Sequence, residues 1–301
     1  MGRNKLLSLC IPTNGISEWV FPVLDSIYNN YYGDLEAFEV IITDNGDNIS
    51  FKQDIKKYVS KFSNLIYKET TAIQFQNQIE AFKLATGDYI KFINHRMKLL
   101  PGALEHLIKF VKMNYKDKPI AYFSNGNIRD YDTDNFDDFA KALSYWSSWS
   151  AGTGIWKTDF EKIKTQNFSG LFPHIPIIFS DPCRQKYIID NAILMEEIPC
   201  DETKKGRYDL FNAFLVEYMT IILDLFNKKL ISQKTFIEIK RATLGFALEL
   251  RYKYVIKKEP SSYVISDFRE SYSIFYSNDS FYNMLFRFYF KKLYLKLKPW
   301  K

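Results

Sequence analysis

The alternation of apolar and amphipathic segments in the first third of the chain most constrains its fold. Short apolar runs alternate with segments whose apolar residues recur at helical spacing, in the order 6–11, 20–28, 39–43, 52–62, 65–67, 74–85, 89–93 and Pro101 to Val111. Such alternation is typical of a mostly parallel sheet with helices on both faces. The sequence therefore predicts an α/β fold.

Two residues that interrupt regular structure refine these helices. Gly87 follows the segment 74–85 and is predicted to be its C-terminal glycine cap. Pro22 lies inside the segment that follows the first strand, and it fits a helix there only if it falls in the first turn.

Polar clusters directly follow three of the apolar runs. They are Pro12-Thr13-Asn14, Asp44-Asn45-Gly46 and Asn94-His95-Arg96. Ligands of open α/β sheets bind beyond the carboxyl ends of the strands. These clusters therefore predict a nucleotide site.

The remainder of the chain divides into a less regular middle, about 116–200, and a helical end. The acidic stretch 130–138 mimics a calcium loop, but Asn135 stands where the loop needs glycine and Lys141 where it needs glutamate. We therefore expect a solvated surface loop there. Helices are predicted at 208–228, 232–256 and about 280–297, after a boundary near 201–206.

The charge of the chain is uneven. The 301 residues carry a formal charge of +6 and 17% aromatic residues. The last 21 residues hold no acid and six cations, so the rest of the chain is neutral; the cations are Arg287, Lys291, Lys292, Lys296, Lys298 and Lys301. A basic, aromatic tail predicts an anionic partner, either a membrane surface or a nucleic acid.

The cysteine content and the apolar stretches indicate the compartment. Three cysteines are too few for a disulfide framework, which favours a reducing compartment such as the cytoplasm. The N-terminal segment lacks the apolar core of a signal peptide. Glu217 and Asp224 interrupt the most apolar stretch, 211–226, so we expect no membrane-spanning helix.

Three motifs together resemble family-2 glycosyltransferases of the GT-A fold. They are LLSLCIPTNG at 6–15, FEVIITDNG at 38–46 and ATGDYIKFINHRMKLLPGALEHL at 85–107. The resemblance covers 5–112 well, 144–200 loosely and the helical end hardly at all. It implies a Rossmann-like GT-A domain with a nucleotide-sugar-binding half at 1–115, an acceptor-binding half at 116–205, and a helical C-terminal region at 206–301.

The resemblance also implies donor-binding residues. Pro12, Thr13 and Asn14 match the segment that passes the nucleoside, and Asp44 matches the acid that binds the base, typically uracil. A carboxylate that accepts from an imide N–H discriminates well against bases without that donor. The alternative is that Asp44 is only a turn residue.

The metal motif of the family is replaced in this chain. The family usually has D-x-D where Asn94, His95 and Arg96 stand. In one interpretation, Arg96 and His95 neutralise the donor diphosphate in place of a cation. In the other, Asn94 still ligates manganese or magnesium weakly. We expect reduced metal dependence.

The acceptor side is predicted from two further segments. SWSAGTGIW at 148–156 resembles an acceptor loop in which Gly152 and Thr153 admit a sugar and Trp149 stacks on it; the alternative is that its tryptophans are core residues. The catalytic base is predicted to be His174, with Asp181 as its rival. A lone histidine can equally be structural.

These features together predict an enzyme. It would transfer a sugar from a nucleotide donor, UDP-linked in our prediction, to a glycan or lipid-linked saccharide with inversion, in bacterial surface polysaccharide synthesis. The alternative is an inactive nucleotide- or glycan-binding member of the same fold. The basic tail predicts peripheral attachment to the inner face of the plasma membrane, with a homodimer interface or a tail packed on the catalytic domain as alternatives; no nucleic-acid-binding module is recognisable.

Overall fold

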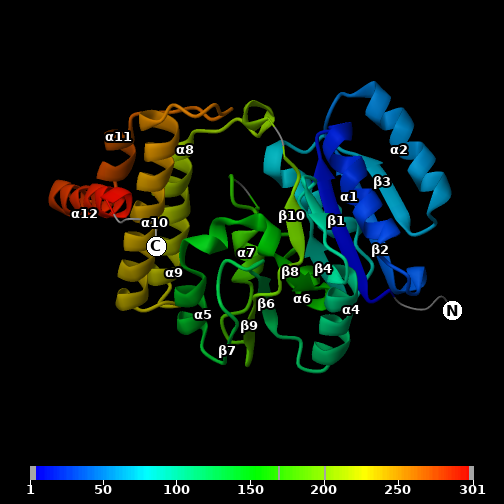
Figure 1. Cartoon of the computed structure of the whole chain (residues 1–301). Helices are drawn as coiled ribbons and strands as arrows, with labels where there is room; N and C mark the ends of the chain where they lie inside the picture. The colour runs from blue at the N-terminus through cyan, green and yellow to red at the C-terminus, as the bar shows by residue number, and fades with distance from the viewer. Residues whose placement is uncertain (1–4, 169, 200, 298–301) are drawn as a thin grey trace. The chain divides into compact units, whose positions relative to one another are not determined.

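The chain forms two compact units, Met1–Pro199 and Cys200–Lys301. The structure, a computed structural model, describes residues 5–168, 170–199 and 201–297 (Figure 1). The boundary predicted near 201–206 lies beside this division. The division of the first unit into a donor half and an acceptor half stays a prediction.

The first unit contains the strands that the structure describes. Their bounds are β1 Leu7–Thr13, β2 Phe38–Asp44, β3 Leu65–Glu69, β4 Tyr89–Phe92, β5 Met97–Leu99, β6 Ile120–Phe123, β7 Tyr131–Thr133, β8 Gly154–Trp156, β9 Tyr187–Asp190 and β10 Met195–Glu197.

Helices follow or connect these strands and make up most of the second unit. In the first unit they are α1 Ser17–Asn29, α2 Ile49–Lys61, α3 Asn77–Leu84, α4 Ala103–Asn114, α5 Phe136–Leu143, α6 Lys157–Ile163 and α7 Ile175–Ile178. In the second unit they are α8 Leu210–Asn212, α9 Met219–Asn227, α10 Gln233–Arg251, α11 Phe268–Ser273 and α12 Asn278–Leu297. The π-helical turns Ala213–Tyr218 and Tyr252–Ile256 join α8 to α9 and extend α10.

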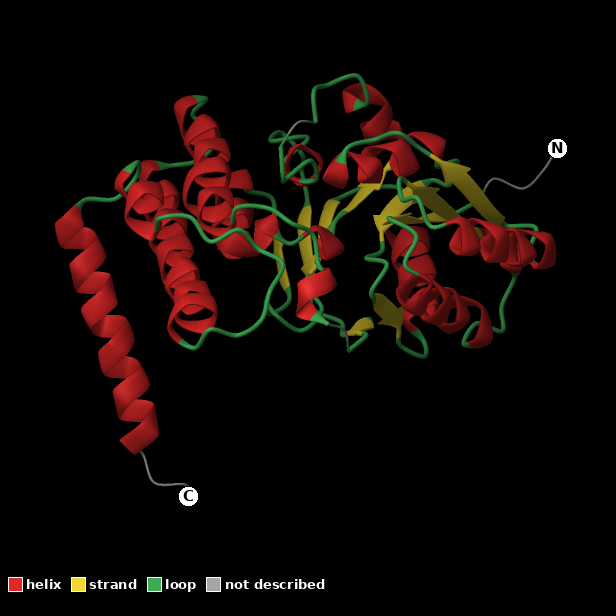
Figure 2. Cartoon of the chain, turned by 90° about the horizontal axis from the view of Figure 1, so that it is seen from above, coloured by secondary structure: helices red, strands yellow, loops and turns green. Residues whose placement is uncertain are grey.

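The central sheet confirms the predicted parallel α/β fold. Its strand order is β3-β2-β1-β4-β8, and all neighbours are parallel except β8, which is antiparallel to β4. Helices cover both faces of the sheet (Figure 2). The last residues of β1 and β2, Thr13 and Asp44, are paired in register. They lie at the same edge of the sheet because the strands are parallel. We call this edge the carboxyl edge.

A second sheet continues the first. It has the order β6-β9-β7, with β6 parallel to β9. An antiparallel bridge between Tyr122 and Thr153 links β6 to the segment that enters β8. Since β8 is antiparallel to β4, strands β6 and β9 run in the same direction as β4. Their amino ends therefore lie at the edge opposite to the carboxyl edge.

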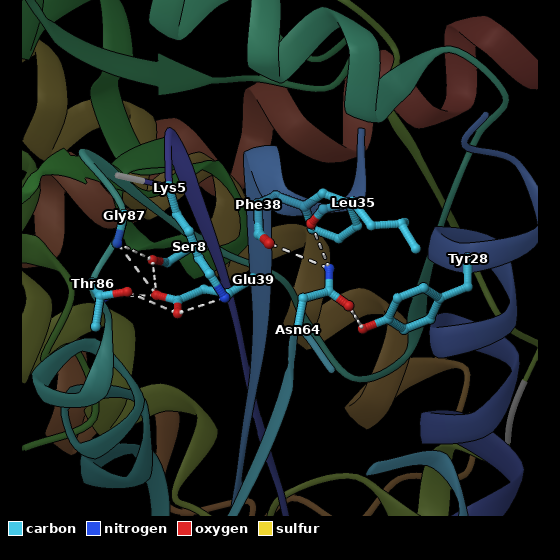
Figure 3. Close-up of polar contacts among 9 residues, drawn as sticks. All are labelled: Lys5, Ser8, Tyr28, Leu35, Phe38, Glu39, Asn64, Thr86 and Gly87. Atoms are coloured by element: carbon cyan, nitrogen blue, oxygen red, sulfur yellow. Dashed lines mark hydrogen bonds and ion pairs between the residues drawn. The ribbon is translucent and has the colours of Figure 1, made fainter. Parts of the chain in front are cut away.

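A buried carboxylate fastens the amino end of the central sheet. Glu39 Oε1 accepts from Ser8 Oγ (2.6 Å), from the Thr86 N–H (2.6 Å) and from the Gly87 N–H (3.3 Å), while Oε2 accepts from Thr86 Oγ1 (2.9 Å) (Figure 3). Lys5 Nζ lies 3.8 Å from Oε2. The Thr-Gly pair of the ATGDY motif is thus the element that docks β4 beside β1 and β2.

Two sequence expectations about helix ends are wrong. Helix α3 ends at Leu84 with an extended Ala85 cap, so Gly87 is not its glycine cap. A Cβ at Gly87 would fall against the backbone of Leu7 and Ser8, and close packing on β1 is the reason for glycine there. Pro22 lies in the second turn of α1, not the first.

The acidic stretch at 130–138 also differs from the surface loop that we expected. It forms β7, which pairs antiparallel with β9, and the first turn of α5. Asn135 caps α5 by accepting from the Asp138 N–H (3.1 Å). Acidic residues in a first helical turn are favoured by the helix dipole, so these acids mark a helix start.

The second unit has its own aromatic core. Phe268, Tyr272 and Phe281 pack together, with the Tyr272 and Phe281 rings stacked at 4.1 Å. Among the described helices, Leu210–Asn227 has the length and composition of a membrane span, and 44% of it is buried. Core helices of soluble proteins meet the same criterion, so the absence of a span stays a prediction. Cys10, buried, and Cys183, exposed, are free thiols.

We expect Glu39→Gln to lower the free energy of unfolding by about 3 kcal/mol, because an amide nitrogen would face buried donors and leave them unsatisfied. Urea denaturation measures this change. Glu36→Gln, at an exposed position, is the matched control and should stay near wild type. Equal stability of the two variants would contradict the anchoring role of Glu39.

Candidate active site

The tips of β1 and β2 are tied together by one amide side chain. Asn77, the first residue of α3, donates through Nδ2 to Thr13 O (3.0 Å) and to Thr43 O (2.8 Å). The Asn45 N–H also donates to Thr13 O (3.1 Å). These bonds replace ladder bonds where the strands end, so the predicted donor residues at the two tips are held in one place. Beyond them, Asn14 is exposed and Pro12 is partly buried.

Asp44 lies buried at the tip of β2. Its Oδ1 accepts from the Gly46 N–H (2.8 Å) and its Oδ2 from Tyr67 Oη (2.9 Å). Burial raises the pKa of this carboxyl, and the two hydrogen bonds oppose that shift. The structure gives Asp44 the bonds of a turn residue. Each oxygen keeps a second lone pair, so base recognition stays a prediction.

His95 connects the tip of β4 to the tip of β1. Its Nδ1 lies 2.8 Å from Thr13 Oγ1, and its ring meets the edge of Trp19 at 5.1 Å. Burial, and after it the charge of Arg96, lowers the pKa of His95 to about 3. The ring is therefore neutral near pH 7. This environment favours the neutral ring, and the interpretation in which His95 helps to neutralise a diphosphate stays a prediction.

Arg96 is the cation beside these tips. Its guanidinium carbon lies 5.4 Å from the centre of the Trp19 ring, and Nη1 lies 3.9 Å from Glu197 Oε1. Trp19 therefore holds the guanidinium through a cation–π contact. Because Arg96 and Glu197 are far apart for an ion pair and partly exposed, their attraction is weak.

The residues at the former metal motif do not fit a divalent cation. Asn94 Oδ1 accepts from the Arg96 N–H (3.0 Å), His95 Nδ1 is bonded to Thr13, and Arg96 is itself positive. Hard cations take several oxygen ligands, preferably carboxylates. Among the described residues, no group of three or more His, Cys, Asp or Glu side chains could hold a metal ion.

The segment predicted to admit a sugar packs on tyrosine rings instead. A Cβ at Gly152 would collide with the ring of Tyr122, whose Oη donates to Trp146 O (2.6 Å) and Trp149 O (3.0 Å). Thr153 is buried. Gly152 is therefore required for packing against Tyr122, and no contact here supports acceptor binding by Gly152 or Thr153. Trp149 packs partly buried against the core, so its stacking on a sugar stays a prediction.

Lys91 is a residue that the sequence reasoning missed. It lies in β4, is fully buried, and its Nζ donates to Phe92 O (2.9 Å), Thr153 O (3.2 Å) and Ala151 O. The Thr153 N–H would otherwise continue the hydrogen-bond ladder between β8 and β4, but it donates to Ser150 O instead (2.9 Å). Nζ thus fastens the turn before β8 to the end of β4. A charge in the middle of the apolar run YIKFI was the available signal.

His174 lies beside the same segment but is enclosed. It is 3% exposed, and its Nε2 has no hydrogen-bond partner. Backbone hydrogen bonds with Ser147 and Ser148 raise its pKa, but burial is the larger effect and lowers the pKa to about 4. The ring is therefore a weak base, and Nε2 is shielded in this conformation.

Asp181 lies at the wrong edge of the sheet to be the base. It precedes β9, and its Oδ2 pairs with Arg184 Nε (3.1 Å). Arg184 Nη1 in turn donates to Lys118 O (3.1 Å), just before β6. Both strands begin at the edge opposite to the carboxyl edge. The prediction of Asp181 as the rival base is therefore wrong.

The geometry at the carboxyl edge agrees with the comparison of sequences. The model of glycosyl transferase family 2 matches residues 8–170, which is more than half of the chain. The chain belongs to this family. The three motifs at 6–15, 38–46 and 85–107 contain β1, β2 and β4 of this glycosyltransferase and the polar residues at their carboxyl ends. No curated protein matches the chain significantly.

Solved structures share the fold of this glycosyltransferase. Residues 1–349 of TarS from S. aureus match with a TM-score of 0.58 at 12% identity, covering 82% of this chain and 74% of that one. The same fragment in complex with UDP-GlcNAc matches with a TM-score of 0.54 at 14% identity, over 94% and 80% of the two chains. The longer TarS structure is covered over 46% of its length. At these identities the likeness shows the fold alone.

We expect Lys91→Met to lower the free energy of unfolding by about 2 kcal/mol near pH 7, because buried carbonyls lose their donor. Burial lowers the pKa of Lys91 from 10.5 to about 7. Between these two pH values Lys91 is protonated in the unfolded chain and largely neutral in the folded chain. The free energy of unfolding of the wild type therefore gains a contribution from Lys91 that rises from pH 7 towards 10. The Met variant should lack that contribution.

Urea denaturation across this pH range measures both effects. Lys83→Met, at a half-exposed lysine on α3, is the control and should keep the wild-type slope. A Lys91 variant with wild-type stability and slope would show that the Nζ bonds contribute nothing.

Proposed function

We propose that this glycosyltransferase transfers a sugar from a uridine diphosphate donor to a saccharide acceptor. One observation carries the proposal. Thr13, Asp44 and His95, from three different strand ends, are held together by strand register and by the 2.8 Å contact between His95 and Thr13. This convergence at the carboxyl edge is where an α/β sheet binds a nucleotide.

The choice of uridine rests on Asp44 and on the shared fold. The second lone pairs of its carboxylate can accept the imide N–H of uracil, a donor that cytosine and adenine lack at this position. Relatives in fold have been solved in complex with UDP-GlcNAc and with UDP. The sugar itself is not specified by these contacts.

We further propose that Arg96 neutralises the diphosphate without a tightly held metal. A guanidinium presents several donors in a planar fork that matches phosphate oxygens. The Trp19 ring holds the guanidinium near the tip of β4. Because burial favours the neutral form of His95, Arg96 is the residue of the 94–96 motif that can stabilise the negative charge developing on the leaving diphosphate.

The reaction proposed is a single inverting displacement. The acceptor hydroxyl oxygen bonds to the anomeric carbon as the bond from that carbon to the diphosphate oxygen breaks. The hydroxyl proton passes to His174 Nε2, which has no hydrogen-bond partner in this conformation. The negative charge moves to the diphosphate beside Arg96.

An acceptor can reach Nε2 only after a conformational change that uncovers the ring, because the ring is enclosed. A glycan or lipid-linked saccharide of bacterial surface polysaccharide synthesis is the acceptor class that we propose. The enclosed, weakly basic His174 and the substituted metal motif favour a second candidate, a binding protein without turnover. Release of UDP from a UDP-sugar in the presence of acceptor distinguishes the two.

We expect UDP to raise the melting temperature more than GDP, CDP or ADP do, with no change when EDTA replaces manganese. Arg96→Gln should weaken UDP binding about tenfold or more, since a charge-assisted bond to phosphate is lost. Lys98→Gln, two residues along and paired with Glu196, is the matched control and should bind UDP as the wild type does.

Loss of UDP binding on chelation would contradict a metal-independent diphosphate site. Stronger binding of another nucleoside diphosphate would contradict the choice of uridine. Calorimetric titration of the same variants measures the affinities directly.

A further inference from the structure

Helix α12 presents two different faces. On one face, Phe281 is buried against Tyr272, Phe288 packs on the aromatic core of the second unit, and Lys292 Nζ pairs with Glu249 of α10 (2.7 Å). Lys292 therefore belongs to the packed face, where its Nζ also lies 5.1 Å from the centre of the Tyr252 ring.

The other face carries large apolar side chains that nothing described covers. Phe286 is 72% exposed and Phe290 63%, and their rings stack on each other at 6.2 Å. The exposed residues recur at helical spacing and form a stripe, the α12 stripe, which consists of Tyr282, Phe286, Phe290, Leu293 and Tyr294. Contiguous exposed apolar surface of this kind marks an interaction site.

The charges around the stripe indicate what covers it. Arg287 and Lys291 are exposed beside it, and Asp279, in the first turn, is the acid of this helix. In a symmetric dimer the same patch meets itself, so these cations would face each other with no acid along the stripe to pair with them. Anionic headgroups complement both cations, and tyrosine rings suit the boundary between headgroups and acyl chains.

We propose that the α12 stripe docks this protein on the surface of an anionic membrane, with the helix lying in the interface. The phenylalanine rings enter the acyl boundary while Arg287 and Lys291 contact phosphate groups. This surface is separate from the residues of the proposed transfer reaction, so it stands whether or not that proposal holds. Lys298 and Lys301, part of the predicted basic tail, lie outside the described residues.

Vesicle co-sedimentation of the full chain tests the proposal. Wild-type protein should bind mixed phosphatidylglycerol–phosphatidylcholine vesicles, and bind less as salt rises. The double variant Phe286→Ser/Phe290→Ser should bind at least tenfold more weakly, because two exposed rings no longer enter the bilayer. Arg287→Gln/Lys291→Gln should lose about fivefold per cation on anionic vesicles and nothing on pure phosphatidylcholine.

The control is Ile73→Ser/Met113→Ser, which removes two side chains of similar exposure, 73% and 71%, from the first unit. It should bind vesicles as the wild type does. Because all these positions are exposed, circular dichroism should show unchanged folding. Wild-type binding by the phenylalanine variant, or no binding by the wild type, overturns the proposal. A wild-type dimer that becomes a monomer in the phenylalanine variant, measured by light scattering, also overturns it and makes the stripe an interface between copies.

Discussion

The site depends on the parallel register of β1, β2 and β4, which brings three polar strand ends to one edge of one sheet. Hydrogen bonds from Asn77 to Thr13 and Thr43 fix that edge after the ladder has ended. A strand shifted by one residue would turn its tip to the other face. The positions of Asp44 and His95 therefore follow from the pairing of β1 with β2 and β4, which is fixed several residues earlier in each strand.

Two buried charges hold the ends of this sheet in different ways. Glu39 collects hydrogen-bond donors at the amino end, from β1 and from the turn before β4. Lys91 donates to acceptors at the carboxyl end and ties the turn before β8 to β4. Each side chain is accommodated in the interior because its hydrogen-bonding capacity is largely used, although burial still lowers the pKa of Lys91 to about 7. Together they connect the donor-side strands to the segment beside His174.

The sequence was most informative where structure is local. Apolar periodicity predicted β1 to β4, α1 to α4 and the long helices of the second unit, because burial of one face follows directly from spacing. The polar strand ends were predicted to converge, and the structure brings Thr13, Asp44 and His95 together. Family motifs added the glycosyltransferase activity, which periodicity cannot show.

The sequence failed where the answer depends on tertiary contacts. Gly87 and Gly152 are required by a neighbouring strand and a tyrosine ring, which no local pattern reveals. Asp181 was placed near the site by its order in the chain, yet the direction of β9 puts it at the opposite edge. The pKa of His174 is lowered by burial, which the sequence does not show, and the sorting of α12 into two faces required its contact with α10.

A crystal structure of this protein soaked with a UDP-sugar tests the central claim most directly. We expect the uracil ring beside Asp44, the diphosphate within hydrogen-bonding distance of the Arg96 guanidinium, and the sugar on the side of His174. A nucleotide bound elsewhere, or a diphosphate held by a metal on Asn94 with Arg96 turned away, would contradict it.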